Sequence, residues 1–224
     1  YRLSKDFMPA DIRQGGAQCF EYRGIRNHYG ALTINMLGRY QVDNACLALV
    51  AIECLRDASV AVDETALRLG LEKARWEGRM ERVSERPDVY LDGAHNPASA
   101  QRLAETIRDL KSSYRKLVLV IGILGDKDYR GIVDALVPLV DRVVVSKPHY
   151  SRALEVRVLA EEIRKLHGSV AAAETIGDAI VLARDGATSD DMILVTGSLY
   201  VVGDARSLLV SGDGPSGALA GLKG

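Results

Sequence analysis

The feature that most constrains the fold is the alternation of short apolar runs with longer amphipathic stretches. The runs LVLVIGIL (117–124), RVVVS (142–146) and MILVTG (192–197) are almost wholly apolar, as is typical of strands buried on both faces of a sheet. Stretches with a helical spacing of apolar residues occur around residues 131–140, 155–166 and 176–187. This alternation predicts an α/β fold: a Rossmann-like, mainly parallel sheet with helices on both faces.

The N-terminal part of the chain follows a different pattern. Strand-like pieces such as QCFEYRG and GALTINMLG are separated by glycines, and helices are predicted over residues 42–57 and 63–74. Residues 79–85 and 88–93 flank a turn-like Arg-Pro-Asp and are predicted to pair as an antiparallel hairpin. The change of pattern near Arg75 and Trp76 divides the chain into units 1–74 and 75–224. Because the chain opens at Tyr1 without an initiator Met, we expect it to be cut from a longer protein.

The stretch YLDGAHNPAS (90–99) combines a strand end with a helix start. Asn96 followed by Pro97 is a strong signal for a helix N-terminus, and the apolar spacing predicts a helix over residues 97–111. Asp92 and His95 are therefore left at the carboxyl end of a strand, beside the positive end of a helix. Such a corner can bind an anion.

Similar corners follow the other apolar runs: GDKDY after the first, KPHYSRA after the second and TGSLY after the third. In an open α/β sheet, ligands bind beyond the carboxyl ends of the strands, so these corners are expected at one binding edge. Asp92 is suited to ribose hydroxyls and Lys127 to a phosphate or carboxylate, while Ser198 begins another helix. The alternative for each corner taken alone is structural, because Asp, Ser and Asn are also common turn formers and helix caps.

Composition and missing motifs exclude several classes of function. The 29 basic and 30 acidic residues nearly cancel, which predicts no nucleic-acid or membrane partner. The three cysteines lack metal or disulfide spacing, which favours the cytoplasm. No metal site built by this chain is predicted, and the phosphate-binding signature G-x-x-x-x-G-K-[ST] is absent.

Five motifs in order across residues 37–206 resemble the C-terminal portion of folylpolyglutamate synthase and the bifunctional dihydrofolate synthase, within the wider Mur ligase group. These motifs are LGRYQVDNACLAL, WEGRMERV, LDGAHNP, GILGDKDY and VTGSLYVVGDAR. Members of this group are built from a central ATPase domain with a phosphate-binding loop and a smaller Rossmann-like C-terminal domain. The resemblance implies that residues 1–74 are the tail of the first domain and residues 75–224 the complete second domain.

The resemblance also implies functional roles for individual residues. Asn44, Arg79 and Asp92 occupy positions that look like the family's ATP contacts, while His95 and Ser198 resemble catalytic positions on the glutamate and nucleotide side. The alternatives are a local hydrogen bond for Asn44 and a solvated linker charge for Arg79. The sequence departs from the family at Tyr40, where His is common, and at Glu77, where Pro is common.

The implied reaction uses ATP and Mg²⁺ to activate a pteroate or folate carboxylate as an acyl phosphate, which the amine of glutamate attacks. The main magnesium ligands are expected outside this chain, and the chain is expected to be a monomer that is inactive alone. If Asp92 contacts ATP, Asp92→Asn should weaken ATP binding and leave folding nearly unchanged. Two alternatives remain: a non-catalytic nucleotide-binding α/β module, and a UDP-muramoyl amino-acid ligase. The motif DGAHNP, in which His precedes Asn, favours the folate branch.

Overall fold

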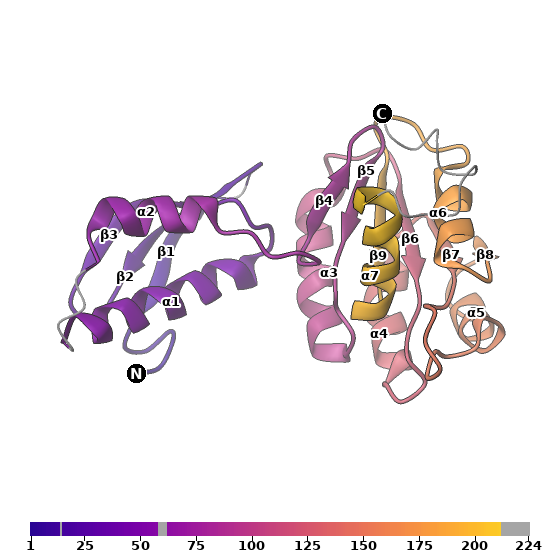
Figure 1. Cartoon of the computed structure of the whole chain (residues 1–224), viewed down its shortest axis with the longest axis horizontal. Coiled ribbons are helices and arrows are strands. Elements are labelled where there is room, and N and C mark those ends of the chain that lie inside the picture. The colour runs from indigo at the N-terminus through magenta and orange to yellow at the C-terminus, as the bar shows by residue number, and fades with distance from the viewer. Residues whose placement is uncertain (14, 58–61, 212–224) are drawn as a thin grey trace. The chain divides into compact units, whose positions relative to one another are not determined.

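The computed structural model describes residues 1–13, 15–57 and 62–211, and it divides into two compact units (Figure 1). The units are Tyr1–Trp76 and Glu77–Gly224, so the division lies close to the position at which the sequence pattern changes. The C-terminal residues 212–224, which the sequence reading assigned to the second unit, lie outside the described residues. Among the described residues, no helix combines the length and apolar character needed to cross a bilayer.

The first unit is a three-stranded antiparallel sheet with two helices. Its strands are β1 (Met8–Arg13), β2 (Gln18–Arg23) and β3 (His28–Ile34), and its helices are α1 (Arg39–Asp57) and α2 (Glu64–Lys73). Phe20 and Tyr22 are two residues apart in β2, so their aromatic side chains lie on the same buried face. They pack with Leu49 of α1 in the core of this unit. Asp63 caps α2, since its carboxylate accepts from the Ala66 N–H at 2.7 Å.

A buried glutamate holds the turn between β2 and β3. Glu53 of α1 is only 1% exposed, and its carboxylate accepts from the backbone N–H groups of Ile25 and Asn27, each at 2.9 Å. Gly24 lies so close that a Cβ there would be 2.3 Å from Oε1 of Glu53. The turn therefore needs both a carboxylate at position 53 and a glycine at position 24.

The second unit contains a six-stranded sheet in the order β4-β5-β9-β6-β7-β8. Neighbouring strands are parallel except for the antiparallel hairpin of β4 and β5. The strands are β4 (Glu81–Ser84), β5 (Asp88–Leu91), β6 (Leu117–Ile121), β7 (Arg142–Val145), β8 (Val170–Ala172) and β9 (Met192–Thr196). The predicted Rossmann-like, mainly parallel sheet and its hairpin are confirmed.

Helices cover both faces of this sheet (Figure 1). They are α3 (Pro97–Lys111), α4 (Tyr129–Leu136), α5 (Val156–Arg164), α6 (Ile176–Arg184) and α7 (Leu199–Arg206), with short turns η1 (Val137–Leu139) and η2 (Ser207–Ser211). The apolar faces of α6 and α7 pack on Val118, Val120 and Val195 of the sheet. The strands β6 and β9 are buried at every position, which explains why they read as continuous apolar runs.

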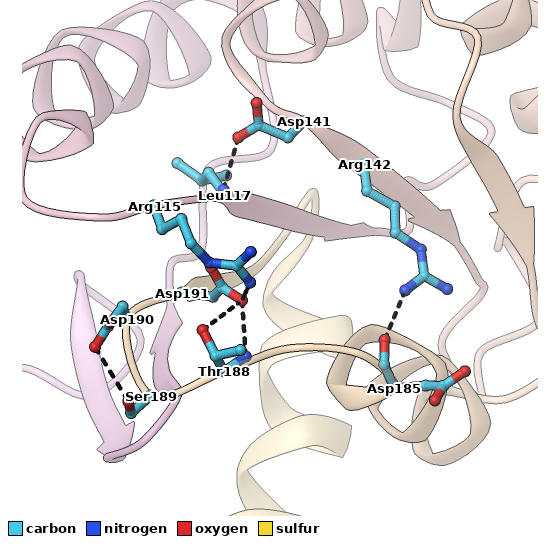
Figure 2. Close-up of polar contacts among 9 residues, drawn as sticks. All are labelled: Arg115, Leu117, Asp141, Arg142, Asp185, Thr188, Ser189, Asp190 and Asp191. Carbon is cyan, nitrogen blue, oxygen red and sulfur yellow. Dashed lines mark hydrogen bonds and ion pairs between the residues drawn. The ribbon is translucent and has the colours of Figure 1, made fainter.

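Polar contacts at the amino-terminal edge of the sheet join the beginnings of its central strands (Figure 2). Asp191, which directly precedes β9, is 1% exposed, and its Oδ2 accepts from Nη2 of Arg115 at 2.6 Å and from the Thr188 N–H at 2.7 Å. Asp141, before β7, accepts from the Leu117 N–H at 2.8 Å. These carboxylates connect the starts of β9 and β7 to the start of β6 through hydrogen bonds, so their role is structural.

Asp191→Asn is expected to destabilise the chain more at neutral than at acid pH. Burial opposes ionisation of this carboxyl, but the donors from Arg115 and Thr188 outweigh burial and hold the pKa of Asp191 below its ordinary value of 3.8. Because the folded-state pKa is lowered, the stabilisation is present above the unfolded-state pKa and is lost as the pH falls through the folded-state pKa.

Urea unfolding of wild type and Asp191→Asn, at about pH 7 and about pH 3, measures this effect as two differences in the free energy of unfolding. The difference between the two proteins should be smaller at the lower pH. An equal difference at both pH values would show that the charge of Asp191 adds nothing to stability.

Candidate active site

The first corner lies between β5 and α3, and its geometry begins with a capped helix. Oδ1 of Asn96 accepts from the Ser99 N–H at 2.8 Å, while Oγ of Ser99 accepts from the Asn96 N–H at 3.1 Å. This reciprocal pair satisfies two N–H groups that a helix N-terminus otherwise leaves open. The predicted helix start at Asn96 and Pro97 is confirmed, and these contacts account for Asn96.

Asp92 ends β5 and is 3% exposed. Its Oδ2 accepts from the Met80 N–H at 3.0 Å, and its Oδ1 accepts from the Ala94 N–H at 2.9 Å. Each carboxylate oxygen therefore already has a backbone donor. This geometry argues against the expectation that folding would tolerate Asp92→Asn, because an amide NH₂ would face one of the two N–H groups. Contact of Asp92 with ATP stays a prediction.

Arg79 lies beside this corner on a tight turn before β4. The turn uses positive φ values at Gly78 (+67°) and Met80 (+47°), and the Gly78 carbonyl accepts from the Gly93 N–H at 2.8 Å. A Cβ on Gly93 would lie 3.4 Å from Nη1 of Arg79, so the half-buried guanidinium lies directly against the corner. The structure thus brings Arg79 against Gly93, the residue after Asp92, which argues against the interpretation of Arg79 as a solvated linker charge.

His95 is held in one tautomer. Its Nδ1 lies 2.8 Å from the carbonyl oxygen of Gly93, and since a carbonyl can only accept, Nδ1 carries the proton in this contact. Among the described residues no hydrogen bond engages Nε2. In the neutral ring Nε2 is therefore a proton acceptor, fixed in direction at the binding edge.

The fourth corner, between β9 and α7, depends on a glycine. Gly197 has φ of +106°, and a Cβ there would lie 2.5 Å from the backbone oxygen of Gly122 at the end of β6. Ser198 follows, 2% exposed, and its Oγ accepts from the Val201 N–H at 3.1 Å as the N-cap of α7. The structural alternative for Ser198 is thus realised, while its catalytic role stays a prediction.

The first and fourth corners adjoin. A Cβ on Gly93 would lie 2.5 Å from Cδ2 of Leu199, which is the first residue of α7. The Asp92 N–H donates to the Val195 carbonyl at 3.0 Å, so the ends of β5 and β9 are bonded to one another. His95 and Ser198 therefore belong to neighbouring loops on one edge.

The second and third corners are also joined. The Gly125 N–H donates to the Arg152 carbonyl at 2.8 Å, and the Leu154 N–H donates to the Ile123 carbonyl at 2.9 Å. In the second corner, Nζ of Lys127 lies 3.2 Å from Oδ2 of Asp126. The ammonium of Lys127 is the main cause of a lowered Asp126 pKa. Lys127 is at the predicted edge, and its nucleotide contact stays a prediction.

Two tyrosines link the third corner to the fourth. The rings of Tyr150 and Tyr200 stack with centroids 3.9 Å apart and planes at 17°. Hydrogen bonds from Tyr200 and Arg152 lower the pKa of the Tyr150 hydroxyl. Sequence reasoning named the two segments that carry these residues but singled out none of the three, because stacking between a loop and a helix 50 residues apart leaves no local signal.

Asn44 is the remaining predicted site residue, and it lies in the first unit. It is exposed on α1, where its Nδ2 donates to Oε1 of Gln41 at 3.0 Å. This is the local hydrogen bond that the structural alternative requires. Its assignment to ATP stays a prediction.

The described residues offer no clustered donor set for a divalent cation. In residues 1–13, 15–57 and 62–211, no group of three or more His, Cys, Asp or Glu side chains could hold a metal ion. Asp92, Asp126 and Asp128 of the first two corners are each engaged with other groups. The described residues therefore do not fit Mg²⁺ as a resident ion.

The comparison with family models decides the relationship. Residues 78–199, which contain the first three corners and all of the fourth except Tyr200, match the model described as Mur ligase, glutamate ligase domain. The chain belongs to the Mur ligase family. The resemblance drawn from the motifs is thereby confirmed.

Relatives within the Mur ligase family lie mainly in its folate branch. The dihydrofolate synthase/folylpolyglutamate synthase of Mycobacterium tuberculosis is 36% identical over 210 residues, covering 86% of this chain and 43% of that protein. A UDP-N-acetylmuramoyl-L-alanyl-D-glutamate–2,6-diaminopimelate ligase of Corynebacterium glutamicum is 35% identical over 127 residues, covering 55% of this chain and 23% of that protein. The chain thus spans less than half the length of these Mur ligases.

Among solved structures, folylpolyglutamate synthase of Mycobacterium tuberculosis complexed with ADP and AMPPCP has a TM-score of 0.85 at 35% identity. The match covers 94% of this chain and 49% of that chain. Both units of the present Mur ligase chain therefore have counterparts in one nucleotide-binding protein.

Proposed function

We propose that this chain is the C-terminal part of an ATP-dependent ligase that joins L-glutamate to the carboxylate of dihydropteroate, of a folate, or of both. The observation that carries the proposal is the folate-branch match, which covers 86% of the chain, whereas the cell-wall ligase match covers 55%. Residues 1–74 would then be the tail of the central ATP-binding domain and residues 75–224 the C-terminal domain.

The proposed reaction has two steps. A carboxylate oxygen of the acceptor attacks the γ-phosphorus of ATP, breaking its bond to the β-phosphate oxygen and releasing ADP. The amine of glutamate then attacks the carbonyl carbon of the acyl phosphate, an amide bond forms, and inorganic phosphate leaves with the acceptor oxygen. Both steps need charge neutralisation and exclusion of water.

The residues of the first and fourth corners have distinct roles in this proposal. Nε2 of His95 accepts the proton that the attacking amine loses, because Nδ1 is already committed to the Gly93 carbonyl. Ser198 begins α7, whose N-terminus favours an anion beside it. Asp92 holds the Met80 N–H and thereby positions Arg79, which is suited to an ATP phosphate.

The remaining roles concern ATP and its surroundings. Asn44 and Lys127 complete the proposed nucleotide contacts. Mg²⁺ would enter with ATP and take its protein ligands from outside this chain. Cys19, Cys46 and Cys54 are free thiols, which supports a cytoplasmic enzyme, and we propose that it acts as a monomer.

The purified chain is expected to form no glutamate amide, because its sequence lacks the phosphate-binding loop. The longer ligase that carries this chain is expected to incorporate labelled glutamate with ATP present and dihydropteroate or a reduced folate as acceptor. A UDP-muramoyl acceptor is the control.

Chromatography of labelled products decides between the outcomes. Product with the UDP-muramoyl acceptor alone would move the function to the cell-wall branch. Product from the isolated chain would overturn the proposal that it is one part of the catalytic machinery.

A further inference from the structure

Arg152 is built into the binding edge by backbone contacts. Its carbonyl accepts from the Gly125 N–H at 2.8 Å, and Leu124 and Ala153 form an isolated antiparallel bridge between the same two loops. Arg152 therefore does not project from an independent surface loop. Its backbone is tied to the loop that carries Asp126 and Lys127.

The guanidinium of Arg152 is oriented by three neighbours. Nη2 donates to the Tyr150 hydroxyl at 3.0 Å, and Cζ lies 5.2 Å from the centre of the Tyr150 ring. Tyr150 is itself stacked on Tyr200 of α7, which limits its rotation. Nη1 lies 3.5 Å from Oδ2 of Asp126. Among the described residues, no hydrogen bond engages Nε.

The charges at this point do not cancel. Arg152 and Lys127 both approach Oδ2 of Asp126, at 3.5 and 3.2 Å, so two cations share one carboxylate. The three side chains together therefore carry about one net positive charge, which can attract one further anionic group at this point of the edge. A planar guanidinium held in place is also the side chain best suited to bind a carboxylate through two hydrogen bonds.

We propose that Arg152, oriented by the stacked pair of Tyr150 and Tyr200, binds a carboxylate of the incoming glutamate. This inference rests on the proposed function, since it names how that substrate is held. Glutamate presents two carboxylates while its amine reacts, so it needs cationic partners for them that are separate from the group that accepts the proton. Arg152 is a substrate-binding residue in this account, and Tyr150 is a positioning residue.

The test is steady-state kinetics of the longer ligase carrying Arg152→Met. The KM for glutamate should rise about tenfold or more, because a charge-assisted pair of hydrogen bonds is lost, while the KM values for ATP and for the pterin acceptor stay within about twofold. Tyr150→Phe, which removes only the hydroxyl that holds Nη2, should raise the KM for glutamate by a smaller factor.

Arg157→Met is the matched control, because Arg157 is 88% exposed and its recorded ion pair is to Glu161 of the same helix. It should leave every KM unchanged. The thermal midpoint of each variant separates local loss of binding from misfolding. If Arg152→Met does not fold, Arg152→Lys takes its place. This variant keeps the positive charge but loses the two parallel N–H donors of the guanidinium, so it should also raise the KM for glutamate.

Two amides show which carboxylate is bound. Glutamine lacks the side-chain carboxylate, and the α-amide of glutamate lacks the α-carboxylate. The amide whose KM is unchanged by Arg152→Met lacks the carboxylate that Arg152 binds. An unchanged KM for glutamate, an equal rise in the KM for ATP, or sensitivity with both amides overturns the inference. A wild-type ligase that forms no glutamate amide would instead overturn the proposed function.

Discussion

Asp92→Asn is expected to lower the free energy of unfolding of the chain by about 1–3 kcal/mol, the cost of leaving a buried backbone N–H unsatisfied. In the folded chain both carboxylate oxygens of Asp92 accept backbone N–H groups, from Met80 at 3.0 Å and Ala94 at 2.9 Å. An amide has one acceptor and one donor, so one of these N–H groups would face an NH₂ group instead. Urea unfolding measures the change.

Asp109→Asn is the matched control, because Asp109 is exposed on α3 and no hydrogen bond of its side chain is found among the described residues. It should change the free energy of unfolding by less than about 0.5 kcal/mol. If Asp92→Asn proved as stable as the control, the carboxylate would have no positioning role, and a direct contact with ATP would be its remaining function.

The same substitution should also impair ligation in the longer enzyme, for an indirect reason. The Met80 N–H that Asp92 holds is adjacent to Arg79, whose guanidinium lies against Gly93. Loosening this turn displaces Arg79 from the corner. A raised KM for ATP therefore accompanies the loss of stability, and the two effects should appear together.

Much of the second unit could be predicted because its local signals agree with its tertiary environment. The helix over residues 97–111 begins and ends as predicted, since Asn96, Pro97 and the apolar stripe all favour the same element. The strand β8 was not predicted, because it has only three residues at the edge of the sheet and none of them is fully buried. The run LVLVIGIL ends as a strand at Ile121, before Gly122 approaches the Ser146 carbonyl.

The site could be predicted in outline and not in detail. The rule that ligands bind beyond the carboxyl ends of strands identified the four corners, and the sheet order places β5, β9, β6 and β7 side by side. The sequence could not show which polar atoms of these corners are already engaged in hydrogen bonds or ion pairs. The backbone partners of Asp92 and the shared carboxylate of Asp126 depend on tertiary contacts between loops.

His95→Asn is the substitution that shows whether the edge formed by the ends of β5 and β9 carries the proposed ligase chemistry. Asn at this position retains a donor for the Gly93 carbonyl but has no counterpart of Nε2. Turnover with saturating glutamate and ATP should fall about 100-fold or more, the usual contribution of a positioned proton acceptor. His149→Asn is the control, since the recorded hydrogen bond of His149 is made by its backbone N–H to Asp204, and its turnover should be unchanged.

The decisive measurement is therefore the turnover of the longer ligase carrying His95→Asn, alongside its KM for ATP and its thermal midpoint. We expect a large loss of turnover, a KM for ATP within a few-fold of wild type and an unchanged midpoint. Turnover equal to that of wild type would contradict this expectation, because a side chain oriented at this edge with an open acceptor would then take no part in the reaction.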